Sequence, residues 1–93
     1  MALLWPPKDP GETLDYDLDW TVRLNGDIIA TSSWSITIGD DVLSINSNTV
    51  SPSVTKVWLS GGTLGLKYTL QNIITTAAGD TMVESVTVTM KTK

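Results

Sequence analysis

Residues 14–25 read LDYDLDWTVRLN, and apolar and polar side chains alternate along the whole stretch. A period of two residues is that of a β-strand with one buried and one solvated face. A helix would spread Asp15, Asp17 and Asp19 around its circumference, whereas a strand gathers them on one side. The pattern therefore predicts one strand over this stretch, with an apolar face and an acidic face.

Turn signals divide the rest of the chain into similar short runs. Asn25-Gly26 joins two alternating runs and predicts a tight hairpin. Further strands are predicted at residues 27–38, 42–45, 55–59, 66–75 and after residue 80, with residues 46–48 as a loop and 49–52 as either loop or brief edge strand. Tyr68 follows a glycine-rich turn, as does the tyrosine corner of immunoglobulin-like sandwiches, where the hydroxyl bonds upstream backbone. Six or seven strands without a helical period predict an all-β fold, an immunoglobulin-like or fibronectin-III-like antiparallel β-sandwich, over residues 13–93.

The same alternation assigns the large side chains to the core or the surface. Trp20 and Trp34 fall on the apolar sides of their strands, so we expect them to fill the space between the sheets. Val57 and Leu59 are expected to point inward. That choice turns Trp58 outward and makes it a candidate interface residue.

Residues 1–12 differ from the rest because they hold three of the four prolines. Proline lacks a backbone donor and favours extended geometry, so we predict an extended N-terminal arm. Two interpretations of its apolar tip remain open: it caps one end of its own core, or it inserts into a neighbouring subunit. The second makes the following residues partner-binding candidates together with Trp58: Leu3, Leu4, Trp5, Pro6 and Pro7.

Composition argues against several classes of function. The 93-residue chain has room for one domain, its formal net charge is −4, and its six basic residues are scattered, which speaks against nucleic acid. It has no His and no Cys, so the commonest general base and the best nucleophile are missing. We therefore expect no enzyme, no catalytic residue and no cofactor. No apolar run approaches the roughly 20 residues of a membrane span, and no basic region precedes the first apolar residues, so we expect a soluble chain made without cleavage.

The aspartates at positions 15, 17 and 19 are the strongest candidates for a metal site. On a strand, side chains at i and i+2 stand roughly 7 Å apart. Three of them are then too far apart to share one calcium ion, whose oxygen ligands lie at about 2.4 Å. Asp40-Asp41 would add ligands, but Gly39-Asp40-Asp41 is equally a plain turn. We predict no metal site, and a solvated face that discourages edge aggregation or matches a basic partner.

Longer stretches carry a resemblance that spans nearly the whole chain. They are Trp5-Pro6-Pro7-Lys8-Asp9-Pro10-Gly11-Glu12, Leu14-Asp15-Tyr16-Asp17, Asp19-Trp20, Ile29-Ala30-Thr31-Ser32-Ser33-Trp34, Val57-Trp58-Leu59-Ser60-Gly61-Gly62-Thr63 and Ile74-Thr75-Thr76-Ala77-Ala78-Gly79. Together they resemble a family of short phage proteins described as fiber–tail adaptors or small virion structural proteins. The resemblance implies a virion component with an immunoglobulin-like sandwich and supplies no catalytic or ligand-binding residues. Asp80 departs from the family pattern, in which a basic residue follows the glycine.

On this resemblance we expect a non-enzymatic virion protein, assembled in the host cytoplasm, that joins tail components to fibers as a homo-oligomeric ring or array. Its partners would be other phage structural proteins of the tail or capsid, with no nucleic acid and no membrane. Two alternatives remain open. One is a capsid decoration protein that cements shell subunits, and the other is a carbohydrate-binding module that acts in adsorption.

Overall fold

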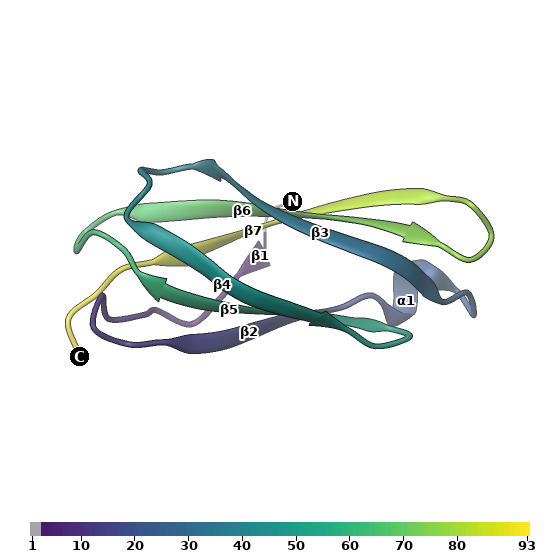
Figure 1. Cartoon of the computed structure of the whole chain (residues 1–93), viewed down its shortest axis with the longest axis horizontal. Helices are drawn as coiled ribbons and strands as arrows, with labels where there is room; N and C mark the ends of the chain where they lie inside the picture. The colour runs from purple at the N-terminus through teal and green to yellow at the C-terminus, as the bar shows by residue number, and fades with distance from the viewer. Residues whose placement is uncertain (1–2) are drawn as a thin grey trace.

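The computed structural model describes residues 3–93, which form two packed β-sheets (Figure 1). One sheet has the strand order β1-β7-β6-β3, and the other has the order β2-β5-β4. The elements are β1 (Leu3–Leu4), β2 (Leu14–Asp19), α1 (Thr21–Leu24), β3 (Ile29–Ile38), β4 (Leu43–Val50), β5 (Val54–Gly61), β6 (Lys67–Thr76) and β7 (Thr81–Thr89). Every strand pair is antiparallel except β1 with β7. The predicted all-β sandwich is confirmed. Within residues 3–93 no helix is long and apolar enough to cross a membrane.

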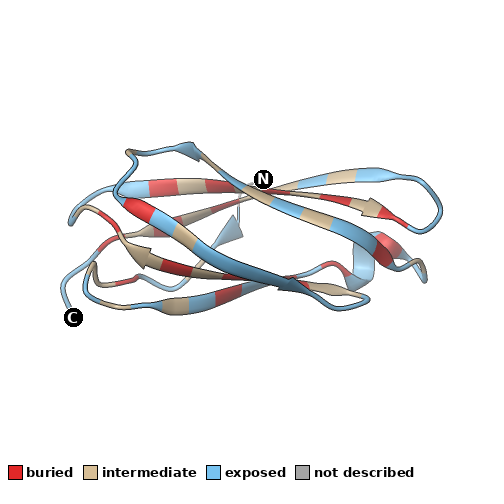
Figure 2. Cartoon of the chain, viewed as in Figure 1, coloured by how far each residue is buried: buried red, intermediate tan, exposed pale blue. Residues whose placement is uncertain are grey.

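The core lies between the sheets, and the strands bury alternate residues into it (Figure 2). β5, β6 and β7 follow the period of two that a strand with one buried face requires. Val57 and Leu59 are fully buried, as predicted, and Trp58 lies on the other side of β5. Trp20 is also buried, whereas Trp34 packs at the margin of the core.

The structure ends the first long strand at Asp19, so the second half of the strand predicted over residues 14–25 is wrong. The Asp19 carboxylate accepts hydrogen bonds from the backbone N–H and the hydroxyl of Thr21, at 2.9 and 2.5 Å. This local bonding competes with the strand ladder and turns the chain into α1. Trp20 and Leu24 both stay buried because residues four apart share one side of a helical turn.

Asn25 and Gly26 turn the chain, but they do not form the predicted hairpin, because β2 and β3 belong to different sheets. Asn25 has left-handed φ and ψ of 49° each and ends α1, and Gly26 follows with φ 93°. Asn25 and Gly26 therefore adopt the positive φ that an Asn-Gly pair favours, but they do so in a connection between the two sheets. Val22, expected on the apolar side of the predicted strand, is 92% exposed on α1.

β4 is longer than predicted, because it continues through the residues expected to form a loop at 46–48. Its register with β5 shifts between Ile45 and Ser47, which is where a β-bulge takes up the extra residue. The displaced Asn46 side chain accepts a hydrogen bond from the Ser60 hydroxyl at 2.9 Å. A polar Asn-Ser-Asn sequence is therefore compatible with a strand when one residue leaves the ladder.

A buried polar network joins the two sheets. Asn72 on β6 accepts hydrogen bonds at its Oδ1 from the Thr55 hydroxyl on β5, at 2.7 Å, and from the Trp20 indole N–H, at 3.2 Å. The same indole N–H also lies 3.0 Å from the Thr55 oxygen. The Asn72 amide donates to Ser32 Oγ and to the Ser33 carbonyl on β3, at 2.9 and 2.8 Å. Buried polar groups are tolerated when all of them find partners, and here one side chain connects three strands and the start of α1.

Tyr68 closes one end of the sandwich. Its hydroxyl donates to Asp40 Oδ1 at 2.5 Å and accepts the backbone N–H of Thr63, five residues upstream, at 2.8 Å. Thr63 also donates its hydroxyl to Asp40 at 2.7 Å, and the bonds from Tyr68 and Thr63 lower the pKa of the Asp40 carboxyl. The predicted tyrosine corner is confirmed, and it ties the β3–β4 turn to the β5–β6 loop.

The network predicts that Asn72→Ala destabilises the fold by about 1–3 kcal/mol, because the buried Thr55 hydroxyl loses its acceptor and the Trp20 indole N–H keeps only its contact with Thr55. Urea unfolding measures the loss. Gln71→Ala is the matched control, since Gln71 is the next residue on β6 and points away from the core; we expect a change within about 0.5 kcal/mol. Equal unfolding midpoints for the two variants would contradict the role assigned to Asn72.

Candidate partner-binding surfaces

The N-terminal segment, defined here as residues 3–12, lies along the edge of β7. Leu3 and Leu4 pair in parallel with Val86 and Thr87. Backbone hydrogen bonds continue this contact, from the Trp5 N–H to the Thr87 carbonyl at 2.9 Å and from the Lys8 N–H to the Thr89 carbonyl at 3.0 Å. The described part of the predicted arm therefore contacts the sandwich along its length, and the first two residues of that arm lie outside the described residues. The division of the chain at residue 12 stays a prediction.

Trp5 fills a place in the core of its own domain. Its ring stacks on Tyr16 of β2 with centroids 4.7 Å apart and an interplanar angle of 16°, and its centroid lies 5.7 Å from that of Trp34 on β3. The Trp5 indole donates to the Asp17 carbonyl at 3.0 Å. Of the two interpretations of the arm, the structure supports core capping for Trp5. A partner has access only to the exposed margin of this ring.

The neighbours of Trp5 are accessible to a partner. Leu4 is 79% exposed and Leu3 is 46% exposed, and Pro6 and Pro7 are exposed as well. Pro6 is held in place, because its carbonyl accepts the Tyr16 hydroxyl at 3.0 Å. Burial raises the pKa of Tyr16, so the phenol keeps the proton that it donates. Partner binding by these residues stays a prediction.

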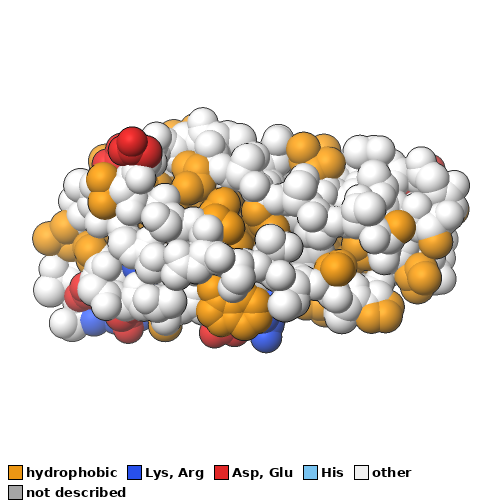
Figure 3. Space-filling model, viewed as in Figure 1, with side chains coloured by type: hydrophobic (Ala, Val, Ile, Leu, Met, Phe, Trp, Pro, Cys, Tyr) orange, Lys and Arg blue, Asp and Glu red, His pale blue; other side chains and the backbone are white. Residues whose placement is uncertain are grey.

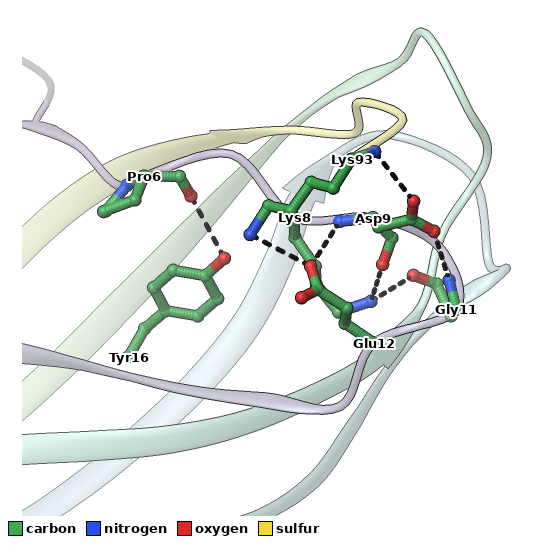
Figure 4. A network of polar contacts seen from close by, with 8 residues as sticks. Pro6, Lys8, Asp9, Gly11, Glu12, Tyr16 and Lys93 are labelled. Atoms are coloured by element: carbon green, nitrogen blue, oxygen red, sulfur yellow. Dashed lines mark hydrogen bonds and ion pairs between the residues drawn. The ribbon is translucent and has the colours of Figure 1, made fainter.

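Lys8 is fully buried, and sequence reasoning did not find it (Figure 4). Its ammonium donates to the carbonyls of Gly61, at 2.7 Å, and Asp9, at 3.0 Å. None of the ion pairs found within residues 3–93 includes Lys8. Burial lowers the Lys8 pKa, and the nearby carboxylates of Glu12 and Asp9 oppose part of that shift. Buried lysines are rare. A Lys between two prolines therefore indicates a solvated charge, and the sequence did not predict its burial.

A tight turn at residues 9–12 contacts Lys93 at the C-terminal end of the described chain (Figure 4). Asp9 and Glu12 bond to each other's backbone, and Gly11 donates its N–H to Asp9 at 2.8 Å. Lys93 then donates its backbone N–H to Asp9 at 3.0 Å and pairs with Glu12 at 3.0 Å. The Gly11 and Lys93 amides lower the pKa of Asp9, and the Asp9 amide and the Lys93 ammonium lower that of Glu12. The polar contacts of this turn are structural and hold the segment in place.

The second candidate is the outer side of the three-stranded sheet, named the acidic face. It consists of Asp15, Asp17 and Asp19 on β2, Lys56, Trp58 and Ser60 on β5, and Ser44, Ser47 and Thr49 on β4. Trp58 lies in the middle of it, with Asp15 opposite on one neighbouring strand and Ser47 opposite on the other. Lys56 pairs with Asp15 at 3.5 Å, and its ammonium lies 5.8 Å from the Trp58 ring centroid. A half-buried Trp within a charged rim has the composition of an interface anchor.

The two candidates lie on different sides of β2. Trp5 stacks on Tyr16 at the inner side of that strand, whereas Trp58 projects from the outer side of the sheet. The structure therefore does not bring Trp5 and Trp58 together into one site. Within residues 3–93, no group of three or more Asp, Glu, His or Cys side chains is placed to hold a metal ion.

A family described as "Podophage GP4 fiber-tail adaptor protein gp77" matches residues 8–89. The chain belongs to this family. No curated protein matches it. Among solved structures, the solution structure of the PKD domain from KIAA 1837 protein matches with a TM-score of 0.58 at 21% sequence identity, covering 99% of this chain and 81% of that one. This likeness concerns the fold and supports the immunoglobulin-like sandwich.

Family membership confirms the resemblance seen in the sequence. The family is one of phage structural adaptors, so the chain is a structural protein of the virion, and its family role is not enzymatic. The match begins at Lys8, the buried lysine. It covers all of the acidic face but not residues 3–7.

The stacking of Trp5 predicts that Trp5→Ala destabilises the folded chain by about 2 kcal/mol, since it removes a large partly buried ring from Tyr16 and Trp34. Leu4→Ala is the control from the same segment. It should change stability by less than about 0.5 kcal/mol, because Leu4 is 79% exposed. Thermal or urea unfolding distinguishes the two. A Trp5→Ala variant as stable as Leu4→Ala would show that the ring does not cap the core.

Burial of Lys8 predicts a distinct pH dependence of stability. The folded-state pKa lies below the unfolded value of 10.5, so the unfolded chain holds this proton more tightly. The wild-type chain should therefore gain stability relative to Lys8→Met as pH rises from the folded pKa toward 10.5. Unfolding measured from pH 7 to 10.5 on both proteins checks this, and subtracting the variant removes the contribution of the tyrosines. A difference that stays constant or falls would contradict a lowered pKa.

Proposed function

We propose that the chain works as an adaptor that joins tail components to fibers, in several symmetric copies within one particle. Membership of the fiber–tail adaptor family over residues 8–89 is the observation that carries this proposal. The fold is suited to the task, because two sheets joined by a buried network form a preformed body that needs little ordering on binding. Assembly would take place in the host cytoplasm, where a chain without cysteine folds without disulfides.

The acidic face is the surface that we assign to the larger partner. Three aspartates and one lysine leave it with an excess of negative charge, so the matching surface should carry Lys or Arg. Trp58 supplies an aromatic anchor in the middle, where partner binding excludes water. The charges around it set orientation and the rate of encounter, whereas the ring contributes most of the binding energy.

Leu3, Leu4, Pro6 and Pro7 form a second, smaller contact. Their apolar surface is exposed beside an ordered strand, and Pro6 and Pro7 restrict the free chain, which lowers the entropy cost of binding. Removal of these residues also removes Trp5 from the core. Point variants that leave Trp5 in place are therefore better tests of binding than a deletion of residues 1–7.

The adaptor role predicts that Trp58→Ala lowers incorporation into particles by about 30-fold, which is the effect of losing a binding contribution of about 2 kcal/mol. Copy number in purified particles is measured by quantitative mass spectrometry. Val22→Ala is the control, since Val22 is 92% exposed on α1 and belongs to neither outer face. Circular dichroism and unfolding establish that both variants fold.

Two outcomes would contradict the proposal. Normal incorporation of Trp58→Ala would exclude the acidic face as the main contact. Labelled chain found on the head rather than the tail of imaged particles would overturn the adaptor role in favour of capsid decoration.

A further inference from the structure

The outer side of the four-stranded sheet differs in chemistry from the acidic face. At its margin Leu4 of β1 stands beside Thr87. The outward side chains of β3, β6 and β7 make up what we name the hydroxyl face. They are Thr31, Ser33 and Ser35 on β3, Thr69, Gln71, Ile73 and Thr75 on β6, and Thr81, Val83, Ser85 and Thr87 on β7. Eight of these eleven residues are threonine or serine, and Lys67 stands at one end of the face, opposite Thr89.

The hydroxyl face carries no charged side chain between residues 69 and 87 on its strands. The only acidic residue of β7, Glu84, alternates to the inner side, where it pairs with Arg23 at 3.1 Å. In Figure 3 charged side chains lie along the lower edge and in one acidic group at the upper left, near the turn between β3 and β4, whereas the middle of the upper edge carries none in this view. Solvated surfaces ordinarily mix both signs of charge, and interfaces are depleted of them.

The middle row of the hydroxyl face is polar and uncharged, because Gln71 stands there between Ser35 and Ser85. The next row holds two apolar side chains, Ile73 and Val83, with Ser33 opposite Ile73. Val83 is 43% exposed. A second copy therefore covers apolar surface and neutral polar groups here without burying a charge.

Hydroxyl side chains complement themselves, because each both donates and accepts a hydrogen bond. The face already shows such pairs between its own strands, Thr31 with Thr75 at 2.6 Å and Thr69 with Thr87 at 3.4 Å. A surface of this kind satisfies the requirement of a two-fold contact, in which the same patch meets itself. A partner of opposite charge, in contrast, would find nothing here to recognise.

We propose that copies of the chain contact one another face to face through the hydroxyl face. The net charge of −4 makes copies repel one another, and this face is the one where a second copy meets no like charge. Three strands of nine or ten residues cover roughly 460 Å² at about 3.3 Å per residue and 4.8 Å per strand, which is below the roughly 800 Å² per partner of a standard interface. The contact is therefore weak between free chains and is strengthened where copies are held close together.

This inference rests on the proposed function, in which several copies of the chain assemble in one particle. Its test uses the purified chain alone. The sequence contains no cysteine, so one introduced residue is the only thiol. Gln71→Cys places it in the middle strand of the hydroxyl face, and Thr49→Cys places the control on the acidic face. Both proteins are treated at high concentration with a bismaleimide that spans the roughly 10 Å between packed sheets.

We expect Gln71→Cys to form covalent dimers at least ten times faster than Thr49→Cys. Equal rates would mean random collision and would overturn the inference. A pair of charge variants gives an independent measurement by sedimentation. Gln71→Glu and Gln71→Lys should each associate less than wild type, and an equal mixture of the two should recover association. No recovery in the mixture would also overturn a two-fold contact at this face.

The same variants separate this inference from the adaptor role. If Gln71→Cys gives no excess of dimers and Trp58→Ala still fails to enter particles, the self-contact is wrong and the adaptor proposal stands. If dimers form and Trp58→Ala enters particles normally, the self-contact stands and the acidic face is wrong.

Discussion

The two sheets depend on one another through the side chain of Asn72. It lies in the core between Leu70 and Ile74, and it bonds to groups from β3, β5 and the start of α1. A slip of β6 by one residue would turn Asn72 outward and place Gln71 in the core without partners. The network therefore makes one register of β6 more stable than the registers shifted by one residue. Apolar packing alone distinguishes these registers less sharply. The register that it selects also decides which residues line each outer face.

Strand positions could be predicted where alternation comes from burial alone. β6 is the clearest case, because its inward residues are apolar or aromatic except for Asn72 and Thr76 and its ends are marked by glycine-containing turns. Prediction failed at Trp20, where alternation continues in the sequence but the Asp19 carboxylate bonds to Thr21 and begins a helical turn. Alternation cannot reveal this, since a short polar side chain fits both a solvated strand face and a turn.

The candidate site could be predicted only in part, and the reason differs between its residues. The outward position of Trp58 followed from the burial of Val57 and Leu59. Trp5 gave no such constraint, because it stands alone before a proline-rich stretch and its contacts with Tyr16 and Trp34 join distant parts of the chain. Lys8 was unpredictable for the same reason, as its acceptors are backbone carbonyls, one of them far away at Gly61.

The turn at residues 9–12 has a practical consequence for anyone who wishes to attach a reporter to this protein. Lys93 bonds to both acidic residues of that turn, and Lys91 donates its backbone N–H to the Lys8 carbonyl at 2.8 Å. A fluorophore or purification tag fused directly after Lys93 would pull on the contacts that enclose the buried ammonium. The exposed β6–β7 hairpin at Ala78-Gly79 is the gentler position, because it lies at the opposite end of the molecule from Lys93 and extends beyond Thr75 and Thr81, the last residues of the hydroxyl face (Figure 1).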